Sequence, residues 1–369
     1  MRSRDFDVLV AGGGLAGSAA AIALARAGRR VLLANLCSER SPALKIGETL
    51  PAVAAVVLRD LGLHERIERA GMAIPSVGTS AAWGGEQPLE NDAIIDLHGH
   101  GWHLDRVRFD AWLREQARAA GVQLCEGRVA AKHTGARLDD RVAVQVIGER
   151  ERTIGCRWLV DATGRRAAIA RGRGARRERR DRLVALYASV RTRSDVDART
   201  RVEAAPSGWW YSALVGSGRR VVAFLTDADL VEPEWRTPAG FRAALDETVH
   251  VLPSADPTLT CAPATTAAHG ARLAPAVGED WLAVGDAALA FDPLSSQGML
   301  NALVTGLQGA TAVDACLRGD DAALAAYERR LLGVWSAYEL NRARAYALER
   351  RWPDAEFWAR RVRRHAPVA

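Results

Sequence analysis

Lysine is almost absent from this chain of 369 residues. Of its 50 basic residues only Lys45 and Lys132 are lysine, so that 48 are arginine. An arginine excess of this size usually reflects the base composition of a genome, and the net charge of +6 is therefore weak support for a polyanionic partner. Because the aromatic residues are not interleaved with basic ones in a recognisable module, we expect no binding of nucleic acid.

Paired cysteines are lacking as well. The five cysteines are odd in number, far apart and without any C-x-x-C pair, which argues against a disulfide framework or a zinc site. The histidines His98, His100 and His103 are not completed by a cysteine or carboxylate cluster, so we expect no bound metal. Reduced thiols in a cytoplasm fit this pattern best.

A membrane-spanning segment is not expected either. Between Asp7 and Arg26 lie 18 uncharged residues, but Gly12, Gly14 and Gly17 break this stretch into a strand-like run and a helical one. A spanning helix or a signal peptide would not begin in this way, and we expect no membrane partner.

What the chain does contain is the composition of a globular protein, with 49% hydrophobic and 25% charged residues. Its length is enough for two domains, or for one domain with a large insertion. Tryptophan is unusually frequent, with 11 residues against 6 phenylalanines and 5 tyrosines.

The N-terminus carries a nucleotide-binding signature. A strand-like run over 6–11 leads into a G-x-G-x-x-G turn, an alanine-rich helix to about Arg26 and a second strand from Val31. Gly12 permits the tight turn, Gly14 lets the backbone approach a pyrophosphate, and Gly17 allows close helix packing. The sequence therefore predicts dinucleotide binding, without deciding between NAD and FAD.

The second strand of such a unit usually ends on an acid that binds ribose, but here Asn35 stands at that position. Its amide can still make ribose hydrogen bonds in weakened form. Whether Glu39 replaces the acid is left open.

Three later segments narrow the choice of nucleotide. Phe109, Leu113 and Ala117 lie on one face of an expected helix that Arg106 precedes. The segment 158–165 reads as a buried strand ending in an Asp-Ala-Thr-Gly turn, and 280–288 is another apolar strand with Asp286 at its carboxyl end, where ligands of open α/β sheets bind.

In this order, the segments resemble the FAD-dependent aromatic hydroxylase superfamily, which includes geranylgeranyl reductases and tryptophan halogenases. The resemblance covers about residues 5 to 325. It implies an α/β fold: a Rossmann-like FAD-binding domain of the aromatic hydroxylase type, with an inserted antiparallel-sheet substrate domain and C-terminal helices. The FAD-binding residues that it implies are Gly12, Gly14, Ala16, Gly17, Asn35, Lys45, Arg106, Asp161, Gly164, Asp286, Pro293, Gly298 and Met299. For Asp286 the alternative is a helix N-cap.

The loop around Pro293 leads into an apolar helix that contains Met299 and Leu303. A helix N-terminus directed at the flavin would stabilise the anionic reduced ring. Tryptophan halogenases carry a catalytic glutamate in this loop, where Ser295 stands here, and a lysine in the region of residues 77–84, where this chain has none. Their W-x-W-x-I-P signature is also missing, so halogenation lacks the nucleophile it requires.

Segments around Lys45, Trp102, Trp209 and Gln297 look more like the flavoproteins that hydroxylate a peptide- or protein-bound tryptophan. This resemblance implies that reduced FAD reacts with O2 to give a C4a-hydroperoxide, which the electron-rich indole attacks. It implies the catalytic candidates His103, Glu48, Ser296 and Gln297, and the substrate-binding candidates Trp83, Trp102, Trp209, Trp210 and Tyr211. The reductant is NAD(P)H itself or a separate flavin reductase, and the partner is a tryptophan-containing peptide or protein.

Each of these candidates has a structural alternative. Tryptophans commonly fill protein cores, His103 can be a buried structural histidine, and Glu48 can cap a helix expected over 51–62. The alternative functions are a halogenase or alkene reductase of the same superfamily, or a non-catalytic flavin-binding partner of a modifying complex.

The expected organisation is discontinuous. The FAD-binding domain comprises residues 1–75, 101–182 and 267–325, the substrate domain comprises 76–100 and 183–266 in strands, and 326–369 forms a helical segment. Two arginine-rich runs, over 171–182 and 350–364, are either solvated faces or a dock for an acidic peptide or carrier.

Overall fold

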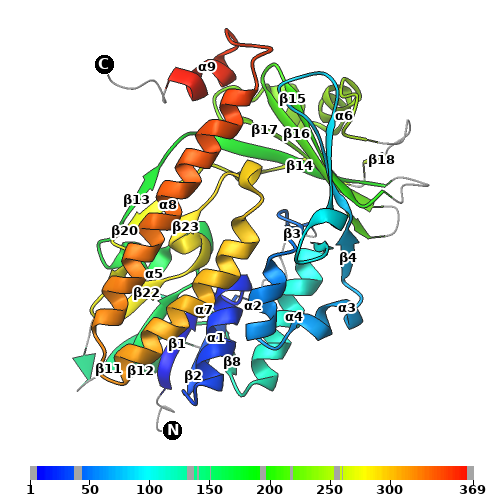
Figure 1. Cartoon of the computed structure of the whole chain (residues 1–369). Coiled ribbons are helices and arrows are strands. Elements are labelled where there is room, and N and C mark those ends of the chain that lie inside the picture. Colours follow the sequence, from blue (N-terminus) through cyan, green and yellow to red (C-terminus); the bar gives the residue numbers. More distant parts are fainter. Residues whose placement is uncertain are drawn as a thin grey trace.

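The computed structural model describes residues 6–36, 44–130, 137–138, 141–149, 151–191, 197–216, 219–252, 258–259 and 261–363 (Figure 1). An α/β layer forms the lower part of the molecule in Figure 1, and an antiparallel sheet lies above it. This is the predicted fold class of the aromatic hydroxylase type. The described residues include no helix long and apolar enough to cross a membrane.

The sheet of the α/β layer has parallel strands at its centre. Val8 in the middle of β1 pairs with Val31 of β2 on one side and with Trp158 of β12 on the other. Its strands are β1 (Phe6–Ala11), β2 (Val31–Asn35), β8 (Gln123–Glu126), β9 (Arg128–Val129), β10 (Arg137–Leu138), β11 (Arg141–Ile147), β12 (Glu151–Asp161), β21 (Val277–Gly278) and β22 (Trp281–Ala283). The carboxyl ends of β1, β12 and β22 therefore meet at one edge, where ligands of such sheets bind.

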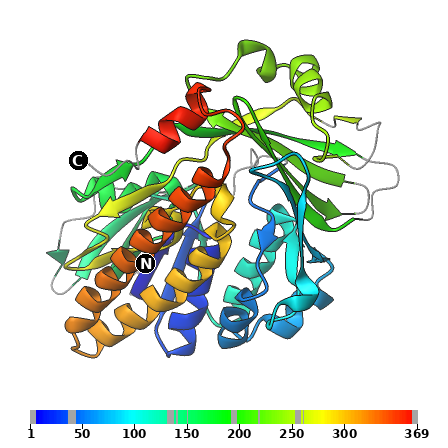
Figure 2. The same ribbon diagram turned by 45° about the horizontal axis from the view of Figure 1, so that its top comes forward.

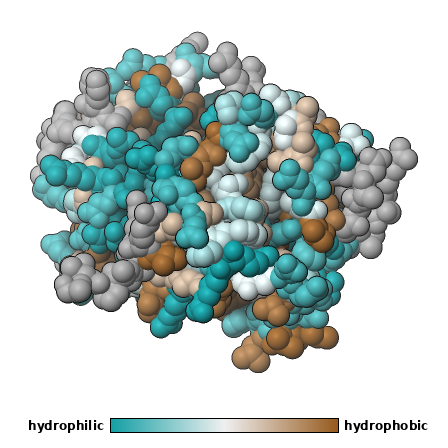
Figure 3. Space-filling view, turned by 90° about the horizontal axis from the view of Figure 1, so that it is seen from above, coloured by the Kyte–Doolittle hydropathy of each residue, from teal (hydrophilic) through white to brown (hydrophobic). Residues whose placement is uncertain are grey.

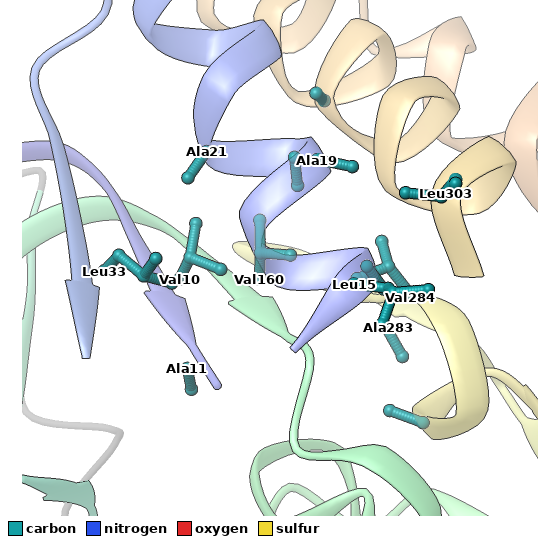
Figure 4. Close-up of a cluster of buried hydrophobic side chains, with 14 of the residues drawn as sticks. Val10, Ala11, Leu15, Ala19, Ala21, Leu33, Val160, Ala283, Val284 and Leu303 are labelled. Carbon is teal, nitrogen blue, oxygen red and sulfur yellow. The ribbon is translucent and has the colours of Figure 1, made fainter. Parts of the chain in front are cut away.

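Helix α1 (Leu15–Arg26) packs directly against α7 (Gly298–Leu317). Their backbones can approach closely because a Cβ at Gly306 would lie 2.4 Å from the Ala16 carbonyl oxygen. Figure 4 shows Leu15 and Ala19 of α1 between Val160 of β12 and Leu303 of α7. This packing brings the N-termini of α1 and α7 to the same edge of the sheet.

Helix α4 (Arg106–Ala119) also packs on α1. Phe109, Leu113 and Ala117 are fully buried, which confirms the predicted apolar face. Three short helices, α2 (Ala54–Asp60), α3 (His64–Arg69) and α5 (Ala168–Gly172), lie in the connections. Two small sheets complete this layer, one of β3 (Thr49–Leu50), β7 (Gly101–Leu104) and β4 (Ala73–Ser76), the other of β13 (Arg176–Arg179), β20 (Ala271–Ala274) and β23 (Leu289–Ala290).

The antiparallel sheet is built mainly from the segments expected to form it. Its strands are β5 (Gly78–Ala82), β6 (Leu89–Asp92), β14 (Leu183–Arg191), β15 (Arg199–Ala205), β16 (Gly208–Gly216), β17 (Arg219–Asp227), β18 (Thr258–Leu259) and β19 (Ala264–Ala267). Neighbouring strands are antiparallel except β5 and β15, which run parallel. The expectation of strands throughout 183–266 is wrong for α6 (Pro238–Asp246), a helix that Thr237 caps by accepting a hydrogen bond from the Gly240 N–H. Phe241 and Leu245, one turn apart, bury its apolar side.

The C-terminal part is helical, as expected. Helix α8 (Ala322–Leu348) runs from the α/β layer up to the antiparallel sheet, and α9 (Glu356–Arg363) follows it at the sheet (Figures 1 and 2). Helix α8 thereby connects the two layers along one side of the molecule.

Candidate active site

The glycine turn after β1 has the geometry of a diphosphate site. Gly12 has a φ of +112°, and a Cβ there would lie 2.3 Å from the Ala162 carbonyl oxygen, while a Cβ at Gly17 would lie 1.8 Å from the Gly12 carbonyl oxygen. Above Gly14, in contrast, a Cβ would meet nothing within 4 Å. Helix α1 has no side-chain cap and no acid in its first turn, so its N–H groups remain available to an anion such as the FAD pyrophosphate.

Asn35 is engaged with this turn and is less available to ribose than predicted. Its Oδ1 accepts a hydrogen bond from the Gly13 N–H at 3.1 Å, and its Nδ2 donates to the Leu36 carbonyl at 3.3 Å. Arg114, which the sequence did not single out, donates to the Gly13 carbonyl at 3.2 Å. Glu39 lies outside the described residues.

Arg106 and Lys45 meet at one carboxylate. Arg106 lies 3.2 Å from Asp110 Oδ1 and donates to the Gly47 carbonyl at 2.8 Å, and Lys45 forms an ion pair with Asp110 Oδ2. Burial and the charge of Arg106 lower the pKa of the Lys45 ammonium. Asp110 was missed in the sequence, although its i+4 spacing from Arg106 on a helix is the signal for such a pair.

A pocket opens beside this ion-pair group. It is lined by Leu44, Lys45, Glu48, Leu104, Asp105, Arg106, Val107, Val215, Arg219 and Val221. Glu48 is its buried carboxyl group, only 1% exposed. The predicted substrate tryptophans do not line this pocket.

Glu48 is bound on one side only. Its Oε2 accepts a hydrogen bond from the Tyr211 hydroxyl at 2.6 Å, and its Oε1 is buried without a hydrogen-bond partner among the described residues. Burial raises the pKa of the Glu48 carboxyl. Helix α2 starts instead after Val53 with no side-chain cap, so Glu48 is not the capping residue that was the alternative.

The prediction that Asp161 contacts the cofactor is corrected. Its Oδ1 accepts hydrogen bonds from the N–H and hydroxyl of Thr163, and its Oδ2 accepts from the N–H groups of Ile169 and Ala170. Asp161 is fully buried and its acceptor positions are filled, so it organises the turn at Gly164, whose φ is +66°.

Asp286 lies next to the start of α1. It belongs to the short turn Gly285–Ala287, where a Cβ at Gly285 would lie 2.6 Å from the Ala16 Cβ. The Asp286 carboxylate is 38% exposed and lies 3.7 Å from the Arg165 Nε. It caps no helix, since Val284 precedes the turn and α7 begins only at Gly298. An exposed carboxylate here is free to accept hydrogen bonds from a hydroxyl-bearing cofactor.

We expect Asp286→Ala to raise the Kd for FAD at least tenfold, because a hydrogen bond to a charged group contributes about 1.5–3 kcal/mol. Flavin fluorescence quenching on titrating the apoprotein measures this. Glu247→Ala, an exposed carboxylate next to α6, is the matched control and should bind FAD like the wild type. Equal affinity of both variants would remove Asp286 from the site.

The loop before α7 is fastened to α8 through Asp292. This fully buried carboxylate accepts hydrogen bonds from the Leu294 N–H at 3.0 Å, from Arg342 Nε at 3.0 Å and from the Tyr346 hydroxyl at 2.8 Å. The Tyr338 hydroxyl accepts from the Asp292 N–H at 3.0 Å. The sequence prediction missed this network, although Tyr338, Arg342 and Tyr346 share one helix face at i, i+4 and i+8.

After Asp292 the loop becomes exposed, and α7 begins without a side-chain cap. Pro293, Ser296 and Gln297 are exposed, and Ser296 has a φ of +51°. A Cβ at Gly298 would meet nothing within 4 Å, while Met299 is buried. The N–H groups of the first turn of α7 thus remain accessible for the electron-rich end of a flavin.

The substrate tryptophans do not form a single cage. Trp83 and Trp209 lie in one cluster on the inner face of the antiparallel sheet, the face toward the α/β layer. Trp210 points to the opposite face against Phe224, because successive side chains of a strand alternate. Trp102 belongs to the core of the α/β layer.

The inner-face group, called the aromatic cluster below, is built largely by the C-terminal segment. The Trp83 ring lies 6.1 Å from that of Trp209, 5.9 Å from that of Tyr346 and 5.4 Å from that of Trp358. Its aromatic members are Trp83, Tyr187, Trp209, Tyr211, Tyr346, Trp352, Phe357 and Trp358. Leu44, Ile46 and Leu294 pack against it, so the cluster joins the pocket region to the loop before α7.

His103 is completely buried between the small sheet and β15 and is not among the residues that line the pocket. Its Nε2 lies 2.9 Å from the Thr200 Oγ1. Burial, with the charge of Arg220, lowers the pKa of the imidazole to about 4. A buried imidazole that is a weak base and does not line the pocket favours the structural alternative over the catalytic role predicted from the sequence.

The low pKa of His103 predicts a stability loss in mild acid. The pKa of His103 is 6.5 in the unfolded state and about 4 in the folded state, so the unfolded state binds a proton first as the pH drops. The free energy of unfolding therefore decreases between these two pH values. We expect His103 to account for about 2 kcal/mol of the difference in unfolding free energy between about pH 7 and about pH 5. Urea titrations of wild type and His103→Gln measure it, and an equally steep pH dependence in the variant would contradict it.

The arginine-rich runs are partly used inside the protein. Arg173 pairs with Asp280, Arg177 donates to the Asp286 carbonyl at 2.8 Å, and Arg361 pairs with Asp227 at 3.0 Å. These side chains are neither freely solvated nor available to dock a partner. Arg364 lies outside the described residues.

Two uncapped helix N-termini, a glycine turn that has no room for side chains at Gly12 and Gly17, and the exposed carboxylate of Asp286 together have the features of a dinucleotide-binding fold. Similarity to known families specifies the nucleotide. The chain belongs to the FAD binding domain family, which matches residues 5–339. It is therefore an FAD-dependent oxidoreductase, and the proteins similar to it include halogenases, a hydroxylase and a reductase.

Two curated proteins and one solved structure are similar to this chain. The putative FAD-dependent oxidoreductase LodB of Marinomonas mediterranea is 28% identical over 97% of both chains. The 1H-pyrrole-2-carbonyl-[peptidyl-carrier protein] brominase of Pseudoalteromonas luteoviolacea is 26% identical over 86% of this chain and 79% of its own. The peptidyl tryptophan dihydroxylase QhpG shares the fold with a TM-score of 0.74 and 24% identity, over 97% of this chain and 78% of its own.

Proposed function

We propose that the chain is an FAD-dependent monooxygenase that hydroxylates the indole ring of a tryptophan carried by a peptide or protein. The observation that carries this proposal is the position of the aromatic cluster. It packs on Leu294 of the loop before α7 and on Ile46 beside the pocket. Most of its rings are buried, and its half-buried members Trp83 and Tyr211 are the ones that an aromatic substrate near the flavin end of the site would contact.

Glu48 is the residue best suited to the indole nitrogen. Its Oε1 is buried without a partner and its pKa is raised, and both properties favour accepting the N–H proton as the ring becomes electron-poor. Tyr211 would keep the carboxyl oriented through its hydrogen bond to Oε2.

Bound FAD would supply the transferred oxygen atom from O2, with electrons from NAD(P)H or from a separate flavin reductase. The residues that would hold it are those of the glycine turn, Asp286 and the N-terminus of α7. Exposed Ser296 and Gln297 would border the flavin on the loop side.

The named substrates of two similar proteins support a polymer-bound substrate. QhpG is described as a peptidyl tryptophan dihydroxylase, and the brominase acts on a pyrrole attached to a peptidyl-carrier protein.

Halogenation is the second candidate, favoured by the similarity to the brominase. Two features oppose it. Ser295 occupies the loop position at which tryptophan halogenases carry their catalytic glutamate, and the stretch 77–84 contains no lysine. Lys45 is the only lysine among the described residues, and it forms an ion pair with Asp110.

Heavy-isotope O2 tests the proposal. Reduced holoenzyme and a tryptophan-containing peptide should yield a peptide that has gained one labelled oxygen atom, while the same peptide with phenylalanine in place of tryptophan should remain unchanged. Absence of label from the tryptophan peptide would refute the hydroxylase function.

We expect Glu48→Gln to lower kcat by about a hundredfold, within the usual contribution of a general base, with little change in KM.

A further inference from the structure

The stretch from Ala70 to Asp105 has an exceptional charge. In a chain with 50 lysines and arginines it contains none of either, yet it carries the acids Glu86, Glu90, Asp92, Asp96 and Asp105. The hairpin of β5 and β6 and the turn after it fall within this stretch. This acidic segment contrasts with the basic remainder of the protein.

The edge of the antiparallel sheet lies in the same segment. Strand β6 pairs with β5 and, among the described strands, with no other, and all four of its residues are exposed. An edge strand presents unpaired N–H and C=O groups to which another extended chain can add.

Directly after β6 the chain holds large apolar side chains in solvent. Ile94 is 91% exposed, Ile95 75% and Leu97 100%. The backbone there is ordered by hydrogen bonds from the Ala93 N–H to the Val77 carbonyl and from the Asp96 N–H to the Ala93 carbonyl. Figure 3 shows one face of the molecule, on which hydrophilic residues predominate and hydrophobic ones lie in scattered patches. Exposed apolar groups held by an ordered turn mark a contact surface.

This surface is continuous with the candidate active site. Strand β5 ends at Ala82, and the next residue, Trp83, belongs to the aromatic cluster. The Gly84 N–H donates to Glu349 Oε2 at 2.9 Å, which fastens the hairpin to the end of α8. A chain bound along β6 would therefore be held on the same hairpin that contributes Trp83.

The acidic residues on and near β6 determine which kind of chain can pair with this edge strand. Antiparallel pairing of β6 with β6 of a second copy would bring the acids Glu90 and Asp92 of the two copies close together, and like charges facing each other across strands are destabilising. Arg199 neutralises these two acids only in part, at 3.7 and 3.1 Å, and it is a single cation. An extended segment with alternating apolar and basic side chains fits both the edge and the charge.

We propose that the β6 edge with Ile94, Ile95 and Leu97 binds an extended, apolar and basic segment of the polypeptide that bears the target tryptophan. The proposal rests on the proposed function for the identity of this polypeptide. Binding itself does not require turnover, so the two can be tested separately.

The probe is a fluorescent peptide in which a tryptophan is followed by alternating valine and arginine, with a valine–glutamate version as its charge control. Fluorescence anisotropy with the holoenzyme should show at least tenfold tighter binding of the arginine peptide. Ile94→Ser/Leu97→Ser and, separately, Glu86→Gln/Asp96→Asn should each weaken it tenfold. The matched control Val249→Ser/Leu340→Ser also removes exposed apolar side chains and should bind like the wild type.

Turnover separates the docking surface from the chemistry. If the hydroxylase function holds, the same variants should lower kcat/KM for the arginine peptide and leave that for N-acetyl-tryptophan amide unchanged. Loss of binding in the variants without any hydroxylation in the wild type would support the surface and refute the function. Equal binding of both peptides, unchanged binding in the variants, or a wild-type dimer that Ile94→Ser/Leu97→Ser dissociates would overturn the surface proposal.

Discussion

The variant Gly17→Ala should fail to retain FAD and should unfold more easily than the wild type. Its new Cβ would lie 1.8 Å from the Gly12 carbonyl oxygen and 2.9 Å from the Ala162 Cβ, and the backbone of the turn would have to move. Overpacking of this kind costs about 1–3 kcal/mol. Urea titration of the apoprotein and flavin fluorescence measure the two effects.

Gly14→Ala is the matched control for this prediction. Gly14 has a φ of −82°, which alanine adopts without strain, and a Cβ there meets nothing within 4 Å. The apoprotein should therefore keep its stability, while FAD affinity falls at least tenfold because the methyl group occupies the space for the pyrophosphate. Wild-type affinity in Gly14→Ala would show that the diphosphate does not lie above this residue.

The second large effect is expected for Arg342→Met. Arg342 lies between Asp292 and Asp181, and the side chains of these two acids are 0% and 9% exposed. Removing the cation leaves two buried carboxylates without their charge partner, which costs about 3–5 kcal/mol. Because Asp292 holds the loop before α7 through the Leu294 N–H, FAD affinity should fall with stability.

Arg344→Met separates this effect from a general loss of charge on α8. Arg344 lies two residues away on the exposed side of the same helix, and its removal should change the unfolding free energy by less than about 0.5 kcal/mol. Thermal unfolding of both variants, with and without FAD, measures the difference. Equal stability of the two variants would mean that the Asp292 network does not hold the loop.

The local parts of the fold could be predicted from the sequence because neighbours in the chain determine them. The first strand, the glycine turn and α1 follow from an apolar run, a group of glycines and an alanine-rich run in direct succession. The apolar face of α4 follows from i+4 spacing. Helix α6 was missed because its capping Thr237 and its two buried residues are a short signal within a strand-rich region.

The candidate site could be predicted only in part, because its contacts join distant segments. The separation of Trp209 from Trp210 follows from strand alternation, but which face meets the flavin layer depends on how the two layers pack. Asp292 is joined to Arg342 and Tyr346 across about fifty positions of the chain, beyond the reach of a local pattern. Likewise, no local signal shows that the bonds to Thr163, Ile169 and Ala170 saturate Asp161.

A competition between hydroxylation and halogenation of one peptide tests the central claim most directly. Anaerobically reduced holoenzyme is mixed with O2, excess bromide and a tryptophan-containing peptide, and the peptide is analysed by mass spectrometry after a single turnover. A monooxygenase that lacks the lysine and glutamate of halogenases should add oxygen and no bromine. A brominated peptide would contradict the account and assign the chain to the halogenases.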